Sequence, residues 1–116
     1  MMQFKTVRQL LADNHGFTVD RFGNLPNCRY LVSPYKHAEK MFRFGMTGTE
    51  FRHWVKNHAH LLSRPGHYIG GWIDGGITYL DVSIETDSQE VAHRLAIDNF
   101  QLAYYDRTNG ESIYVR

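Results

Sequence analysis

The feature that most constrains this chain is a pair of alternating segments joined by a glycine turn. Residues 67–73 and 77–84 are the two segments, and Asp74-Gly75-Gly76 separates them. Glycine adopts the left-handed backbone angles that a tight turn between antiparallel strands requires. The apolar side chains that share one face of the second segment are Leu80, Val82 and Ile84. A hairpin with one apolar face buries that face against another layer, so the sequence predicts a sheet packed against helices.

Three stretches predict helices that could cover such a sheet. The first, at residues 4–11, repeats apolar residues at helical spacing, and Gly16 is expected to end it in a left-handed conformation. The second starts at a capping box, in which the Thr47 hydroxyl and the Glu50 carboxylate each satisfy a free backbone N–H group. Its apolar face consists of Phe51, Trp54, Val55, His58, Leu61 and Leu62. The third helix is predicted to follow a second capping box at residues 87–90.

The remaining alternating segments predict short strands. In chain order they are residues 17–20, 28–33, 41–44, 101–106 and 111–115. The first two are expected to pair as one hairpin and the last two as another. Residues 1–116 are therefore predicted to form a single α+β domain, in which two or three helices pack on one antiparallel or mixed β-sheet of hairpins.

The charge balance and the cysteine count exclude several classes of protein. Thirteen Lys and Arg residues face twelve Asp and Glu residues, which gives a formal charge of +1 with histidine neutral. This balance argues against an acidic DNA mimic and against a protein that binds through a large cationic field. Cys28 is the only cysteine, so an intramolecular disulfide and a cysteine-based zinc site are both excluded.

The same observations predict a cytoplasmic protein, because a small secreted domain often carries several disulfides. Residues 1–8 interrupt their apolar content with charges and lack the apolar core of a signal peptide. No segment approaches the roughly 18 apolar residues of a membrane span, so no membrane association is expected. The glycine pairs Gly70-Gly71 and Gly75-Gly76 are not followed by the Lys-Ser/Thr of a phosphate loop. No cofactor is therefore predicted.

Aromatic residues are the unusual part of the composition, with seven Phe, seven Tyr and two Trp among 116 residues. If Ile69 and Ile73 face the core, the aromatic residues of the central hairpin gather on the opposite face. Tyr and Trp are preferred anchors of protein interfaces. The predicted partner-binding residues on the two hairpins are Tyr68, Trp72, Tyr79, Tyr104 and Tyr114. In the alternative interpretation, helices cover both sheet faces and these aromatics are core residues.

A mildly basic stripe is predicted on the outer face of the helix that starts at the Thr47 capping box. It consists of Arg52, His53, Lys56, His60 and Arg64. In one interpretation the stripe contacts phosphates or an acidic protein, and in the other it is an ordinary solvated helix face. Nucleic-acid binding through its three permanent cations is expected to be weak and sensitive to salt. No histidine pair here has the i, i+4 spacing of a helical metal site, so no metal site is predicted.

Catalytic signatures are sparse in this sequence. No Gly-x-Ser-x-Gly elbow is present, and no lysine completes a nuclease-type carboxylate arrangement. Asp81 and Glu85 fall on one face of their strand, so an enzyme that uses His67 with either carboxylate is one hypothesis. The sequence favours a non-enzymatic role over this one, and no residue is assigned as catalytic.

Several motifs occur together in the second half of the chain. They are Leu62-Ser63-Arg64-Pro65-Gly66-His67-Tyr68-Ile69-Gly70-Gly71-Trp72, Tyr79-Leu80-Asp81-Val82-Ser83, Asp87-Ser88 followed by Ala92 and Leu95-Ala96, Gln101-Leu102-Ala103-Tyr104-Tyr105-Asp106, and Gly110-Glu111-Ser112-Ile113. Over residues 61–115 the chain thereby resembles small uncharacterised proteins of bacteriophages and actinobacteria. That group has no established activity, so the resemblance assigns no catalytic residue. It implies a phage or mobile-element accessory protein.

These observations leave three hypotheses about function. The first is a phage-type or mobile-element accessory protein that binds a host or phage protein and inhibits a host defence system. The second is a weak nucleic-acid-binding accessory protein that uses the basic stripe, and the third is the small enzyme based on His67. The protein is expected to be a monomer or a homodimer, because an exposed final strand at residues 111–115 could pair with a second copy.

Overall fold

An antiparallel sheet of seven strands runs through residues 2–116, the part of the chain that this computed structural model describes. The strands are β1 (Gly16–Val19), β2 (Tyr30–Val32), β3 (Lys40–Phe42), β4 (His67–Asp74), β5 (Ile77–Thr86), β6 (Ala103–Asp106) and β7 (Glu111–Tyr114). The helices are α1 (Phe4–Asn14), α2 (Gly48–Asn57), α3 (Ala59–Leu62) and α4 (Gln89–Asp98), with a 3₁₀ turn, η1 (Lys36–Ala38). The predicted α+β fold class is confirmed. Four helices replace the expected two or three, because the helix predicted from the Thr47 capping box is divided at His58 into α2 and α3.

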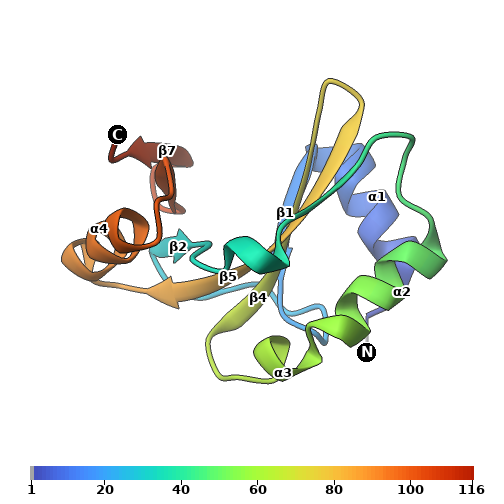
Figure 1. The fold of residues 1–116 in the computed structure, drawn as a ribbon, viewed down its shortest axis with the longest axis horizontal. Helices are drawn as coiled ribbons and strands as arrows, with labels where there is room; N and C mark the ends of the chain where they lie inside the picture. The colour runs from blue at the N-terminus through green and yellow to red at the C-terminus, as the bar shows by residue number, and fades with distance from the viewer. Residues whose placement is uncertain (1) are drawn as a thin grey trace.

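The predicted central hairpin is the longest pairing in the sheet (Figure 1). It extends from His67 opposite Ile84 to Asp74 opposite Ile77. Gly75 and Gly76 make the turn with φ angles of 58° and 79°, values that favour glycine. On its other edge β5 pairs first with β3 and then with β2, so one strand joins the two ends of the sheet.

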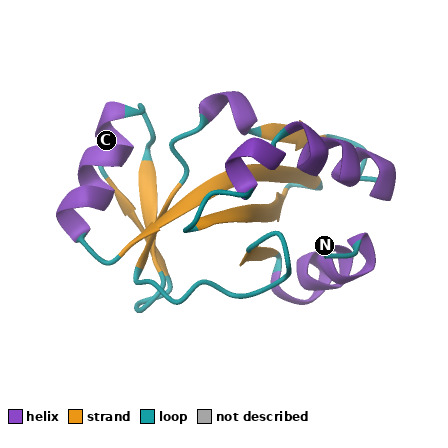
Figure 2. Ribbon diagram, turned by 90° about the horizontal axis from the view of Figure 1, so that it is seen from below, coloured by secondary structure: helices purple, strands orange, loops and turns teal. Residues whose placement is uncertain are grey.

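Two hydrophobic cores lie along this sheet. The first fills the space between the sheet and helices α1, α2 and α3, and its members include Val7, Leu11, Val19, Phe51, Trp54, Val55, Leu61, Leu62, Ile69, Leu80 and Val82. The second lies under α4 and consists of Tyr30, Val32, Ala92, Ala96 and Tyr104. Figures 1 and 2 show α4 at one end of the sheet and α1 and α2 at the other. Leu80 and Val82 lie in the first core as expected, whereas Ile84 packs against the second.

The predicted hairpin between residues 17–20 and 28–33 is wrong. β1 pairs with β4, and β2 lies between β5 and β6. The Asp20 carboxylate accepts hydrogen bonds from the backbone N–H groups of Phe22 and Asn24, which turns the chain locally. β4 and β5 lie between β1 and β2 in the sheet, so the turn residues 22–27 connect two strands that do not pair with each other.

The predicted end of the first helix also differs from the structure. His15, with a φ of 59°, takes the left-handed position that ends α1, and its N–H donates to the Leu11 carbonyl. Gly16 instead starts β1 opposite Trp72, where a Cβ would come within 3.2 Å of the Gly71 carbonyl oxygen. A side chain at this position would therefore push β1 away from β4.

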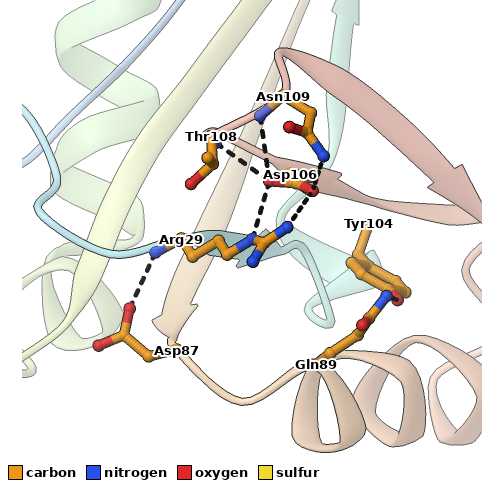
Figure 3. Close-up of polar contacts among 7 residues, drawn as sticks. All are labelled: Arg29, Asp87, Gln89, Tyr104, Asp106, Thr108 and Asn109. Carbon is orange, nitrogen blue, oxygen red and sulfur yellow. Dashed lines mark hydrogen bonds and ion pairs between the residues drawn. The ribbon is translucent and has the colours of Figure 1, made fainter.

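The capping box at Thr47 and Glu50 is confirmed, with both reciprocal hydrogen bonds formed. The second predicted box does not form. Ser88, rather than Asp87, caps α4 by accepting from the Val91 N–H. The Asp87 carboxylate accepts from the Arg29 backbone N–H instead, which joins the start of α4 to the entry of β2 (Figure 3).

A buried carboxylate holds the last hairpin against β2. Asp106 accepts from the Arg29 guanidinium at 3.2 and 3.3 Å and from the backbone N–H groups of Thr108 and Asn109 (Figure 3). The Arg29 hydrogen bonds, together with those two N–H groups, lower the pKa of Asp106 below its usual value. Asp106 is therefore ionised at neutral pH, and it fixes the four-residue turn between β6 and β7 as a structural element.

Candidate interaction surface

Strands β1, β3, β4 and β5 have one face that lies away from helices α1, α2 and α3. Because side chains alternate along a strand, the face opposite the first core is fixed by the strand register. Its residues, called the open face below, are Thr18, Met41, Tyr68, Gly70, Trp72, Asp74, Ile77, Tyr79, Asp81, Ser83 and Glu85. Of these, Met41, Trp72, Asp74 and Glu85 are exposed, whereas Gly70, Asp81 and Ser83 are buried. In Figure 1, α1 and α2 both lie on the other side of the β4–β5 hairpin. The register of β4 and β5 thus confirms the prediction that Tyr68, Trp72 and Tyr79 share the face opposite Ile69.

An aromatic stack stands on the open face near the hairpin turn. Trp72 and Tyr79 are directly opposite each other, and their rings are parallel within 7° with centroids 5.0 Å apart. Trp72 is 41% exposed. On the next strand Met41 is opposite Tyr79 and is 48% exposed. Together these three side chains form a row of accessible apolar surface. Sequence reasoning missed Met41, although the alternation of residues 41–44 was visible.

A buried carboxylate lies in the adjacent row of the same face. Asp81 is only 6% exposed, and its Oδ1 accepts from the Ser83 hydroxyl at 3.2 Å. Gly70 is the cross-strand partner of Asp81, and a Cβ on Gly70 would overlap Oδ1. The absence of a side chain at Gly70 therefore makes room for the carboxylate.

Burial raises the pKa of Asp81 to about 6, although the hydroxyls of Ser33 and Ser83 act in the opposite direction. The ion pairs between residues 2 and 116 are Arg29–Asp106 and Arg94–Glu90, so no cation from this part of the chain pairs with Asp81. A buried carboxylate without a cationic partner is costly to the fold. Titratable groups perturbed in this way gather at functional sites more often than elsewhere.

The neighbouring glycine, Gly71, has an equivalent role on the core side. A Cβ there would overlap the ring of Phe17, which packs against the first core. The centre of β4 therefore has no side chain on either face. The Asp81 carboxylate lies over Gly70 on one face, and the Phe17 ring lies over Gly71 on the other.

Tyr68 lies on the open face but its hydroxyl is already engaged. It donates to Glu85 Oε2 at 2.8 Å. Burial first, and then the Glu85 contact, raise the pKa of Tyr68 to about 12. Tyr68 and Glu85 thus form a polar border to the face, two residues along each strand from Gly70 and Ser83.

The other two predicted partner-binding tyrosines lie elsewhere. Tyr104 is buried in the second core, where it packs edge-on against Tyr30 and accepts from Gln89 (Figure 3). This corrects the prediction for Tyr104, whose strand position faces α4 and leaves no ring surface for a partner. Tyr114 is exposed, but it lies on β7 at the opposite end of the sheet from Trp72. The final strand predicted at residues 111–115 is indeed an edge strand, with β6 beside it.

The residues of the predicted basic stripe are all exposed on α2, α3 and the turn after them: Arg52, His53, Lys56, His60 and Arg64. His53 and Glu50 also line an open hollow of about 520 Å³ between α2 and the η1–β3 segment, with His37, Glu39 and Lys40 on the other wall. Residues 36–64 hold six Lys and Arg against two Asp and Glu, whereas residues 65–116 hold three against eight. The near-neutral total charge conceals this segregation, which a count by segment would have found.

The pairing of His67 with a carboxylate is not formed. The His67 side chain points to the face of Ile84, its cross-strand partner, whereas Asp81 and Glu85 point to the open face. Both ring nitrogens of His67 are engaged, with Nε2 2.8 Å from the Tyr35 hydroxyl and Nδ1 3.0 Å from the Pro65 carbonyl oxygen. The sheet itself separates the histidine from both carboxylates, so the enzyme hypothesis built on them is wrong.

Within residues 2–116, no group of three or more His, Cys, Asp or Glu side chains is arranged to hold a metal ion. No helix in that range has the length and apolar character needed to cross a membrane. Comparison of the chain with protein-family models, curated proteins and solved structures found no match in any of the three.

Proposed function

We propose that this chain is a small cytoplasmic accessory protein of bacteriophage or mobile-element type that acts by binding a host protein through its open face. Inhibition of a host defence system is the role that we propose for this binding. The observation that carries the proposal is the exposed Trp72–Tyr79 stack beside Met41 on a sheet face without helices. Clustered exposed aromatic and methionine side chains are typical of protein-binding surfaces. The phage context rests on the sequence resemblance alone.

Replacing Trp72 with alanine is expected to weaken partner binding at least about thirtyfold, as for a central aromatic anchor. Tagged protein is used to capture partners from host lysate, and the affinity for the enriched protein is then measured for both forms. Phe22→Ala is the matched control, because Phe22 is an exposed aromatic residue in the loop after β1 and lies outside the open face. Equal binding by wild type and Trp72→Ala, or equal loss in both variants, would contradict the proposal.

A second candidate function is nucleic-acid binding by the basic stripe. The observation that favours it is the charge of residues 36–64, which hold six Lys and Arg against two Asp and Glu. Phosphate groups are the ligands that such a surface would attract. The contacts would be to the nucleic-acid backbone, so little sequence preference is expected.

Binding of a labelled DNA strand is expected to weaken by about tenfold or more between 50 and 200 mM salt, if about three cations contact phosphates. The variant Arg52→Gln/Lys56→Gln should reduce both the affinity and the salt dependence. Arg94→Gln serves as the control, because it removes one exposed cation from α4 at the other end of the sheet. Affinity that is absent for single and double strands alike, or independent of salt, excludes this function.

A further inference from the structure

The open face is acidic as well as aromatic. Its charged side chains are Asp74, Asp81 and Glu85, and none of its residues is Lys, Arg or His. Glu39, in the segment before β3, adds to the negative potential felt by Asp81. A partner with phosphate groups or an acidic surface would be repelled here, because like charges that meet in an interface weaken binding. The complementary partner is therefore cationic.

The arrangement of rings and carboxylates narrows the kind of cation. Asp74 is exposed and lies two residues beyond Trp72 on the same strand face, a spacing of about 7 Å. A cation over an aromatic ring is held at about 6 Å or less from the ring centroid. A guanidinium group is planar, stacks on aromatic faces and can form two hydrogen bonds with a carboxylate at once. Arginine meets both requirements, whereas the compact ammonium group of lysine meets them less well.

We infer that the open face binds an arginine-bearing segment of a partner protein, with the guanidinium stacked on the Trp72–Tyr79 pair and hydrogen-bonded to the exposed Asp74 carboxylate. This inference rests on the proposed protein-binding function and specifies the chemistry of its partner.

The two tryptophans provide a direct test. Trp54 is buried and its indole N–H donates to the Ala38 carbonyl, whereas Trp72 is exposed. A capped Gly-Arg-Gly-Arg-Gly peptide is titrated into the ¹⁵N-labelled protein, and the two indole N–H resonances are followed. The Trp72 resonance is expected to shift as peptide is added and to reach a plateau when the binding site is saturated. The Trp54 resonance is expected to stay in place. The lysine counterpart should bind more weakly, and the glutamate counterpart should not bind.

Asp74→Asn is expected to weaken binding of the arginine peptide by about tenfold, which corresponds to the loss of one charged hydrogen bond. Asp98→Asn is the matched control, since Asp98 is an exposed carboxylate on α4. An unchanged Trp54 resonance verifies that each variant is folded. Equal shifts with all three peptides, or an affinity that Asp74→Asn leaves unchanged, would overturn the inference.

Two further outcomes separate this inference from the function on which it rests. If partner capture depends on Trp72 but not on Asp74, protein binding stands and the arginine chemistry is wrong. If the Trp72 resonance moves with protein concentration in the absence of peptide, the occupant is a second copy of the chain, and the inference is overturned in favour of self-association.

Discussion

Replacing Asp81 with asparagine is expected to raise the free energy of unfolding at pH 7.5 by up to about 3 kcal/mol. The pKa of this carboxyl is about 6 in the folded protein, above the usual 3.8. Between pH 4 and pH 6 the folded state therefore binds more protons than the unfolded state. Stability falls as the pH rises through this window, and the full cost is present above it. The neutral amide of asparagine avoids that cost.

Urea denaturation at several pH values between 4 and 8 checks this expectation. The wild type should lose stability across the window, whereas Asp81→Asn should show a flatter profile and the two should converge near pH 4. Asp98→Asn, in which an exposed carboxylate changes, should follow the wild type. If Asp81→Asn is less stable than the wild type at pH 7.5, the ionised carboxylate is stabilised in the fold and the burial cost is absent.

Replacing Phe51 with alanine is expected to lower the free energy of unfolding by about 3–5 kcal/mol, the range for a large aromatic side chain removed from a core. Phe51 is fully buried in the first core, and its ring centroid lies 5.9 Å from that of Phe4. The cavity left in α2 would weaken contacts to α1 at the same time. A domain of this size has a total stability of about 5–15 kcal/mol, so the variant is expected to be partly unfolded near physiological temperature.

The same denaturation experiment, followed by circular dichroism, measures this loss. Phe22→Ala is the control, because Phe22 is exposed and its removal leaves no cavity; its cost should be within about 0.5 kcal/mol. A similar small cost for Phe51→Ala would mean that α2 does not pack on the sheet as described.

Local sequence signals predicted much of this fold. The central hairpin, its turn, the capping box at Thr47 and the closing hairpin all depend on residues near one another in the chain. Each of these signals acts through hydrogen bonds between residues close in the sequence. The local structure that it predicts therefore depends little on distant parts of the chain. The prediction that Trp72 and Tyr79 share a face follows from strand alternation in the same way.

The failures concern pairings and neighbours that are remote in sequence. Nothing local to β1 shows that β4, rather than β2, is its partner, because that choice depends on competition among all the strands. Tyr104 alternates like an exposed strand residue, yet α4 covers it. The burial of Asp81 depends on the bare backbone of Gly70 across the hairpin, and this was visible only once the register was known.

The adjacent glycines of β4 restrict how this sequence can vary. A methyl group at Gly70 would displace the Asp81 carboxylate, and one at Gly71 would displace the ring of Phe17. Gly70 thus contacts Asp81 on one face of the sheet, and Gly71 contacts Phe17 on the other. Replacing either glycine alone would disturb the packing of its own neighbour. In an evolving lineage, this stretch of β4 is expected to change only by coordinated substitutions, Gly70 together with Asp81 and Gly71 together with Phe17.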